Sequence, residues 1–307
     1  MKIIFSFCLL TMALISCQNK EQQPLESNST FVSSTKTLNP YWEQGKGELT
    51  IYNLKQNRYA DVYEDGEVIV IQVTEDFLTG KQVKNDNYTN QKSTQVLKTN
   101  VIKRFTTGIY DYSLMTSVFT PTDMKNYPYT QKVSFSSQDW CGQSFHQINH
   151  RTAGYNIKQY SYFENEGDVS LKIGADFLED ELFNRIRIDP YSLPTGETNA
   201  LPSSEVLRLL HLPIKAIKAN FSSTTTDGQT TLTVSYPSLS RTLNIYFSTQ
   251  PPFTIEGWDD TYPSVFDKKP RTTVATKKAR DMRAYWGENN ISDSALRDDL
   301  KLDNTQK

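Results

Sequence analysis

Apolar and polar residues alternate strictly in two neighbouring stretches of the chain. Residues 231–236 read Thr-Leu-Thr-Val-Ser-Tyr, residues 242–247 read Thr-Leu-Asn-Ile-Tyr-Phe, and a Pro-Ser-Leu-Ser run separates them. Successive side chains of a strand point to opposite faces, so this pattern predicts a β-hairpin. Runs rich in β-branched and aromatic residues predict further strands at 49–54, 68–73, 96–102, 109–119, 131–135 and 155–163.

Turn and helix signals complete this picture. Asp65-Gly66 and Asp227-Gly228 predict tight turns, because both residue types tolerate the positive φ angles of short hairpins. Helical patterns are few: one covers residues 176–186, and one covers 203–211 with Ser203 as its N-cap. The predicted fold is therefore mainly β, a large curved antiparallel sheet with a few short helices. An open barrel and a two-sheet sandwich are the two alternatives.

The N-terminus has the features of an export signal. Residues 1–16 carry one charge, Lys2, followed by an apolar run too short to span a bilayer comfortably. The run ends in Leu14-Ile15-Ser16-Cys17, which resembles the lipobox of bacterial lipoproteins. That resemblance implies cleavage before Cys17 and a lipid on Cys17 that anchors the chain to a membrane. The alternative is an ordinary secretory signal with a chance cysteine.

The polarity of the segments predicts how the whole chain is divided. We expect four parts: a signal peptide at 1–16, a lipidated cysteine with a flexible tether at 17–40, a single β domain at 41–286, and a polar tail at 287–307. Residues 271–286 predict a final strand, and residues 293–302 predict a short exposed helix or a frayed end. Gln18 after Cys17 favours the outer membrane, by the best-known sorting rule. The choice between its periplasmic face and the cell surface stays open.

The composition of the chain limits the partners and cofactors that we expect. The chain has 33 basic and 35 acidic residues and a net charge of −2, which disfavours nucleic acid as a partner. Its hydrophobic content of 37% is sufficient for a packed core. Cys8 leaves with the signal peptide and Cys17 becomes the anchor, so Cys141 is the one thiol left and no intramolecular disulfide is expected. The sequence has no phosphate-binding loop or dinucleotide fingerprint, and we expect no cofactor.

Several strings of the central region resemble an uncharacterised family of bacterial exported lipoproteins, over residues 39–286. They include Asn39-Pro40-Tyr41-Trp42, Thr107-Gly108-Ile109-Tyr110-Asp111-Tyr112-Ser113 and Ser136-Ser137-Gln138-Asp139-Trp140-Cys141-Gly142. Some members carry the name "septum formation inhibitor Maf". Authentic Maf proteins are cytoplasmic α/β nucleotide pyrophosphatases with a Ser-rich Pro-Arg-Arg segment, which this chain lacks. The resemblance therefore implies an exported lipoprotein and no Maf activity.

Cys141 is one candidate for chemistry, as a nucleophile with a histidine base. His146 is five residues away, so on a strand it points to the opposite face, whereas His211 could approach through the fold. A buried, inert cysteine is the alternative that we favour. His146 and His150 would lie about 13 Å apart on a strand, too far to share one metal ion, and no metal site is expected.

Two further sets of residues are candidates. Glu164, Glu166 and Asp168 alternate and could act as acid and base or bind calcium, although a solvated turn is the simpler interpretation. Aromatic residues could line a concave surface that binds a lipid or a glycan, with packing in the core or at a sheet edge as the alternative; the candidates are Tyr110, Tyr112, Trp140 and Tyr162.

Two classes of function remain. The first is a non-enzymatic, membrane-anchored binding or assembly module that holds an apolar ligand, a glycan or a protein on a curved sheet. The second is an envelope hydrolase that uses Cys141 with a histidine, or the Glu164/Glu166/Asp168 cluster. The absence of a convergent catalytic motif in the sequence favours the first.

Overall fold

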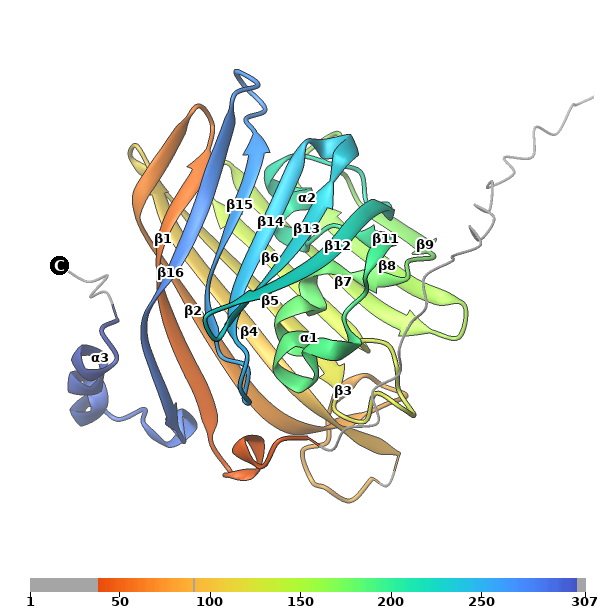
Figure 1. Ribbon diagram of the computed structural model, residues 1–307, viewed down its shortest axis with the longest axis vertical. Coiled ribbons are helices and arrows are strands. Elements are labelled where there is room, and N and C mark those ends of the chain that lie inside the picture. The colour runs from red at the N-terminus through yellow and green to blue at the C-terminus, as the bar shows by residue number, and fades with distance from the viewer. Residues whose placement is uncertain (1–37, 91, 303–307) are drawn as a thin grey trace, which may run out of the picture.

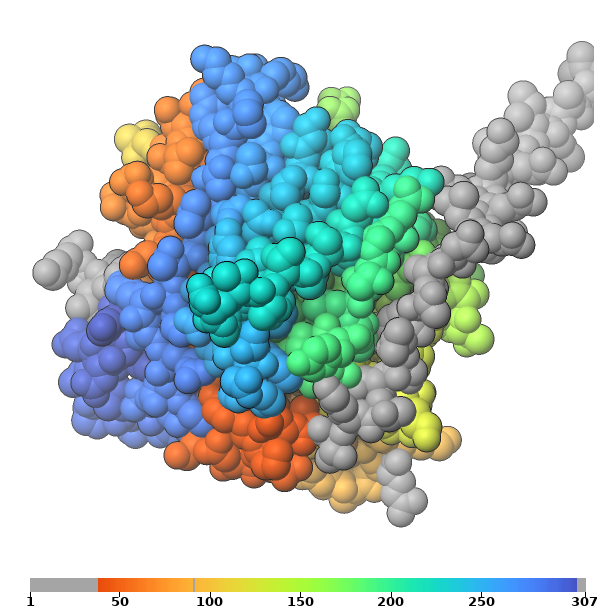
Figure 2. All heavy atoms as spheres, in the orientation of Figure 1, coloured from red at the N-terminus to blue at the C-terminus, as the bar shows by residue number. Residues whose placement is uncertain are grey.

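The computed structural model describes residues 38–90 and 92–302, which form one large curved sheet with short helices packed against it (Figure 1). The predicted signal peptide, Cys17 and nearly all of the tether lie outside the described residues. With all heavy atoms drawn, β12 to β16 form a continuous outer surface on the side facing the viewer (Figure 2).

The strands follow the chain in this order: β1 (Gly47–Arg58), β2 (Asp61–Leu78), β3 (Val83–Lys84), β4 (Ser93–Thr107), β5 (Tyr110–Pro121), β6 (Lys132–Asp139), β7 (Gly142–Arg151), β8 (Gly154–Ser161), β9 (Val169–Ile173), β10 (Phe177–Leu178), β11 (Gly196–Leu201), β12 (Ile217–Thr226), β13 (Gln229–Tyr236), β14 (Arg241–Ser248), β15 (Ile255–Pro263) and β16 (Pro270–Arg283).

The helices are short. The α-helices are α1 (Leu182–Ile188), α2 (Ser204–Leu209) and α3 (Leu296–Asp299), and the 3₁₀ turns are η1 (Pro40–Glu43), η2 (Glu179–Glu181), η3 (Pro190–Ser192), η4 (Pro237–Leu239), η5 (Tyr285–Gly287) and η6 (Ile291–Ala295). Among residues 38–90 and 92–302, no helix combines the length and the apolar character that a membrane crossing requires.

One continuous hydrogen-bonded path joins the strands in the order β10-β11-β12-β13-β14-β15-β16-β1-β2-β4-β5-β6-β7-β8-β9, with β3 attached to β2. All neighbours are antiparallel except β10 and β11. The last strand, β16, pairs with the first, β1, so the two halves of the chain form a single sheet. The mainly β prediction is confirmed, and the sheet is open and curved rather than split into a sandwich.

The predicted hairpin at 231–247 is β13 and β14, paired residue by residue from Gln229–Ser248 to Tyr236–Arg241. Leu232, Val234 and Tyr236 point into the core, as their alternation predicts. The Asp227-Gly228 turn between β12 and β13 is also confirmed, since both residues have positive φ angles of 50° and 79°.

The predicted turn at Asp65-Gly66 is wrong. Both residues lie inside β2, and the chain reverses at Tyr59 and Ala60 instead. Close packing favours glycine there, because a Cβ atom at Gly66 would lie 2.9 Å from the Leu54 side chain and 3.1 Å from the backbone oxygen of Arg104. The register between β1 and β2 shifts just beyond this contact, so the glycine marks an irregularity of the strand pair rather than its end.

The helical parts of the segment 177–209 pack on the concave face of the sheet, where α1 contacts β4 and β5, and α2 contacts β5 and β6. The strands β10 and β11 of the same segment form one edge of the sheet. Ser203 caps α2 by accepting a hydrogen bond from the Val206 amide at 3.4 Å, as the sequence predicts. Arg187 of α1 donates to both oxygens of Glu48 on β1, at 2.7 and 2.8 Å. This buried ion pair fixes the helical segment against the middle of the sheet.

Both ends of the described chain contact the folded domain. Leu38 is buried with Trp42, so the domain begins slightly before the predicted boundary at residue 41. The final strand β16 ends at Arg283, close to the predicted end at residue 286. Residues 291–299 form η6 and α3, and Leu300 packs on Leu49 and Ile51 of β1.

Candidate functional site

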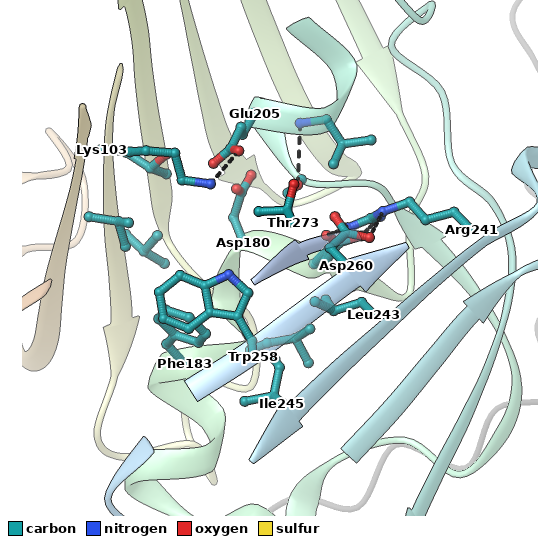
Figure 3. A pocket seen from close by; sticks show the side chains of 17 residues that line it. Lys103, Asp180, Phe183, Glu205, Arg241, Leu243, Ile245, Trp258, Asp260 and Thr273 are labelled. Carbon is teal, nitrogen blue, oxygen red and sulfur yellow. Dashed lines mark hydrogen bonds and ion pairs between the residues drawn. The ribbon is translucent and has the colours of Figure 1, made fainter. Parts of the chain in front are cut away.

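A cavity of about 100 Å³ lies between the helical segment and the concave face of the sheet (Figure 3). We call it the inner cavity. Its walls come from β4, β5, η2, α1, α2 and β14 to β16, and its lining residues are Val101, Lys103, Thr116, Val118, Glu179, Asp180, Leu182, Phe183, Ser203, Glu205, Val206, Arg241, Leu243, Ile245, Trp258, Asp260 and Thr273.

One side of the inner cavity is apolar. The Trp258 indole lies 5.1 Å from the Phe183 ring and 4.8 Å from the Tyr52 ring, measured between ring centroids. Leu243 and Ile245 of β14 lie beside it in Figure 3. These side chains occupy the inward positions of their strands, so the strand alternation that builds the core also builds this wall.

The opposite side contains a buried arginine held between two carboxylates. Arg241 donates to both oxygens of Glu179 at 2.6 Å and to both oxygens of Asp260 at 2.8 and 2.9 Å. Burial alone would raise the pKa of Glu179, but Arg241 lowers it below its usual value. Burial raises the pKa of Asp260 to about 6 against the opposing attraction of Arg241. One arginine therefore balances one of the two carboxylates.

Two more acidic residues line the inner cavity. Lys103 of β4 forms an ion pair with Glu205 of α2 at 2.5 Å. Asp180 accepts hydrogen bonds from the Ser204 amide and hydroxyl, at 3.1 and 2.6 Å, and has no cationic partner among the described residues. Burial raises the pKa of Asp180 to about 7.

The inner cavity therefore has an excess of negative charge. Its four carboxylates, Glu179, Asp180, Glu205 and Asp260, face two cations, Lys103 and Arg241. An unbalanced buried charge is costly, and the site gains stability by taking up a proton or a cationic group. No group of three or more His, Cys, Asp or Glu residues arranged to hold a metal ion occurs in the described part of the chain.

A second hollow, of about 180 Å³, lies at one end of the sheet, where several strand connections meet. We call it the rim pocket. It is lined by Arg58, Tyr59, Tyr112, Asp139, Cys141, Phe163, Arg208, His211, Val265 and Phe266. The hairpin tips between β1 and β2 and between β15 and β16, which contribute to it, both lie at the top of Figure 1.

The structure corrects the interpretation of Cys141 as a buried core residue. Cys141 is exposed, in the turn between β6 and β7. The Asp139 carboxylate accepts hydrogen bonds from the Cys141 and Gly142 amides, at 2.7 and 3.2 Å. This arrangement closes the turn around the carboxylate, so the thiol lies at the surface beside the rim pocket.

The three histidines occupy different places. His146 and His150 both lie on β7, a strand as expected. His146 is buried against the Phe135 ring, and its pKa is lowered by burial to about 4. His211 lines the rim pocket together with Cys141, but no hydrogen bond joins Cys141 to a histidine within the described residues. The Nδ1 atom of His211 instead lies 2.7 Å from Glu166.

The three acidic candidates, Glu164, Glu166 and Asp168, also lie in different surroundings. Glu164 and Asp168 are exposed in the loop between β8 and β9. Glu166 turns inward and contacts Ser161 at 2.6 Å as well as His211. The three carboxylates therefore do not share one face, because the loop forms a turn rather than an extended strand.

The aromatic candidates gather around the rim pocket. Tyr112 lines it directly, and Tyr110 contacts both Tyr112 and Trp140, with ring centroids 5.6 and 6.1 Å apart. Tyr162 lies on Gly142, where an added Cβ would be 2.7 Å from its ring. Trp140 and Tyr162 are 67% and 75% exposed.

Sequence reasoning missed the charged residues of the inner cavity. A usable signal was present, because Arg241 shares its strand face with Leu243 and Ile245, and Asp260 shares its face with Trp258 and Tyr262. A charged residue at an inward strand position is either paired or functional.

Comparison with known proteins gives little further information. No family model matches the chain, and no curated protein matches it. Among solved structures, a beta-barrel-like protein of the domain of unknown function DUF1849 from Brucella abortus is similar over 77% of this chain and 98% of its own, with a TM-score of 0.45 and 8% sequence identity.

Proposed function

We propose that the protein is a non-enzymatic binding module of the cell envelope, anchored by a lipid on Cys17, whose curved sheet holds a small amine in the inner cavity. The observation that carries this proposal is the pairing of an apolar wall with an excess of carboxylates around one partly open cavity. A ligand with a short aliphatic body and an ammonium group complements both sides.

The size of the inner cavity limits the ligand. An apolar cavity of about 150 Å³ takes up benzene, so a cavity of about 100 Å³ fits a ligand of about four or five non-hydrogen atoms. A sugar ring with its hydroxyl groups exceeds this limit. A short alkylammonium ion, or the amine end of a longer chain, does not.

The charge of the inner cavity selects the head group. Asp180 has no cationic partner in the described part of the chain, and its high pKa reflects the cost of a charged carboxylate at this depth. An ammonium group within hydrogen-bond distance would offset that cost. The Trp258 ring adds an attractive surface for the same cation.

Binding is therefore expected to distinguish an amine from its neutral and acidic analogues. Isobutylammonium should bind with a measurable affinity in titration calorimetry, whereas isobutanol and isobutyrate should bind at least about tenfold more weakly, a difference of about 1.4 kcal/mol. Asp180→Asn should remove most of this preference. The matched control is Glu197→Gln, which alters an exposed carboxylate on β11.

Equal binding of isobutanol and isobutylammonium would show that the cavity recognises only the apolar body, and would refute the amine proposal. Retention of the full amine preference in Asp180→Asn would exclude Asp180 as the recognising group.

The membrane anchor is tested separately. Cys17→Ser is expected to prevent acylation and to move the protein from the membrane fraction to the soluble fraction, because the attached acyl chains contribute about 0.8 kcal/mol for each buried CH₂ group. Fractionation followed by a salt wash measures the change, with Cys141→Ser as the control that keeps Cys17. A Cys17→Ser protein that stays in the washed membranes would contradict lipid anchoring.

A further inference from the structure

The rim pocket contains an arginine whose donors are incompletely used. Arg208 of α2 is 5% exposed, and its guanidinium lies over the Phe163 ring at 4.0 Å. Its Nη2 atom donates to Asp139 at 3.3 Å, a long hydrogen bond. Its Nε and Nη1 atoms are buried and have no hydrogen-bond partner among the described residues, and Glu166 lies 3.7 Å from Nη1. A buried donor without a partner is unfavourable, so this guanidinium is suited to bind a further anionic group.

A second arginine lies in the same pocket. Arg58 donates to the Tyr112 hydroxyl at 3.3 Å and to the backbone oxygen of Leu209. It forms no ion pair with a carboxylate within the described residues, and it stacks over the Tyr59 and Tyr112 rings. Neutral groups therefore position the Arg58 guanidinium.

The acidic residues nearby are already engaged. One oxygen of Asp139 holds the β6–β7 turn through the Cys141 and Gly142 amides. Glu166 is shared between Ser161 and His211. The two carboxylates equal the two guanidinium groups in formal charge, but both lie beside Arg208, at 3.3 and 3.7 Å, and both are also held by other donors. Arg58 has no carboxylate partner among the described residues, and Arg208 keeps two buried donors without a hydrogen bond.

Exposed rings surround these cations. Phe266 is 64% exposed and lies 5.3 Å from the Tyr59 ring, on the side of the rim pocket formed by the β15–β16 connection. Trp140 stands at the β6–β7 turn on another side. Large exposed rings around a charged hollow are typical of a surface that stacks on the flat face of a ligand.

We propose that the rim pocket binds the carboxylate or phosphate of an acidic ligand between Arg58 and Arg208, while a ring of the ligand stacks on the exposed aromatic side chains. A guanidinium presents parallel N–H donors that match the oxygens of either anion. This site is separate from the inner cavity and has the opposite charge preference. It does not depend on the proposed amine ligand.

Cys141 provides a reporter at the site, because the thiol is exposed and lines the rim pocket. The experiment measures the rate of Cys141 alkylation by iodoacetamide in the full chain, with the Cys141 peptide quantified by mass spectrometry. The probes are benzoate, phenyl phosphate and glucuronate, with neutral benzamide and an equal concentration of chloride as controls. The three anions distinguish carboxylate from phosphate and an aromatic ring from a sugar ring.

We expect at least one of the three anions to slow alkylation in a saturable way, with an affinity in about the millimolar range that is typical of so small a ligand. Benzamide and chloride should not slow it. Arg208→Gln should weaken protection by about tenfold or more. The matched control is Arg151→Gln, at the opposite end of β7 from Cys141, and it should leave protection unchanged.

Three results would overturn the proposal: no protection of the unaltered protein by any of the anions, equal protection by benzamide, or full protection in an Arg208→Gln protein that is folded by near-ultraviolet circular dichroism. If Arg208→Gln does not fold, the comparison of benzoate with benzamide on the unaltered protein decides the question alone.

Discussion

Replacing Arg241 with methionine is expected to lower the free energy of unfolding by about 3–5 kcal/mol, the range found when one partner of a buried ion pair is removed. Arg241 is 2% exposed and forms hydrogen bonds with both Glu179 and Asp260. Methionine fills much of the same volume but leaves two buried carboxylates without a cation. Urea unfolding at about pH 8, where both carboxylates are ionised in the unfolded chain, measures the loss.

The control for this prediction is Lys218→Met, which breaks the exposed pair between Lys218 and Glu197 and should leave the free energy of unfolding nearly unchanged. A further variant that combines Arg241→Met with Glu179→Gln and Asp260→Asn should recover part of the loss, because the unpaired charges are then absent. If Arg241→Met were as stable as Lys218→Met, Arg241 would not form buried ion pairs with Glu179 and Asp260.

The strands can be predicted because their signal is local. In β13 and β14, the buried inward residues are apolar except Arg241, and the intervening residues are mostly polar, so a period of two residues is enough to identify the hairpin. β2 is harder to predict, because its Asp65-Gly66 pair has the composition of a turn. Gly66 lies inside a strand, where it packs against Leu54 of the neighbouring strand. The sequence of β2 alone gives no information about that contact.

The inner cavity could not be predicted because its parts come from distant segments. Arg241 and Glu179 are 62 residues apart, and Lys103 and Glu205 are 102 residues apart. These pairs form because β16 joins β1 in the sheet and the helical parts of the segment 177–209 pack on the concave face. The alternation places each side chain on the inner face, but only the topology decides which residues meet.

The rim pocket could be predicted only in part, because its aromatic residues and Cys141 are candidates from the sequence and Arg208 is not. Tyr112, Trp140, Tyr162 and Cys141 are candidates from the sequence, and the structure brings them to one end of the sheet. Arg208 gives no such signal because it lies in a helix of six residues, where an apolar face of Val206 and Leu209 accounts for the pattern. Most of this short helix is buried, Arg208 included, so a polar residue on it does not mark a solvent-facing side.

Stability is expected to fall as the pH rises from about 6.5 to 8. Burial raises the pKa of Asp180 to about 7 and that of Asp260 to about 6, above the ordinary aspartate value of 3.8. Between the ordinary and the raised pKa, the folded protein binds more protons than the unfolded chain, so a rise in pH favours unfolding. A tenfold difference in proton affinity between the folded and unfolded states corresponds to about 1.4 kcal/mol of stability. This contribution is present in full below about pH 4 and is lost as the pH passes the raised values.

Other buried acids act in the opposite sense but over a different range. The pKa values of Glu48 and Glu179 are lowered: burial opposes the shift, and Arg187 and Arg241 respectively outweigh it. Their stabilisation is present above the ordinary glutamate value of 4.5 and is lost as the pH falls through the lowered values. Above about pH 5 these two groups are ionised in both states. Burial lowers the pKa of His146 to about 4 and also lowers that of His150, so both histidines bind more protons in the unfolded chain and oppose the aspartates up to about pH 6.5. The raised pKa values of Asp180 and Asp260 therefore determine the slope between about pH 6.5 and 8.

Asp180→Asn is the variant that tests this assignment. It removes the titrating group while keeping an oxygen that can accept from the Ser204 amide, so the unfolding free energy should depend less on pH between about 6.5 and 8. Thermal and urea unfolding at half-unit pH intervals would measure the slope, with Asp176→Asn as a control on the partly buried carboxylate that precedes β10. An unchanged slope in Asp180→Asn would mean that Asp180 ionises normally in the folded protein. Because an ammonium ligand offsets the same burial cost, isobutylammonium should stabilise the unaltered protein more at pH 8 than at pH 5, which links the pH dependence to the proposed function.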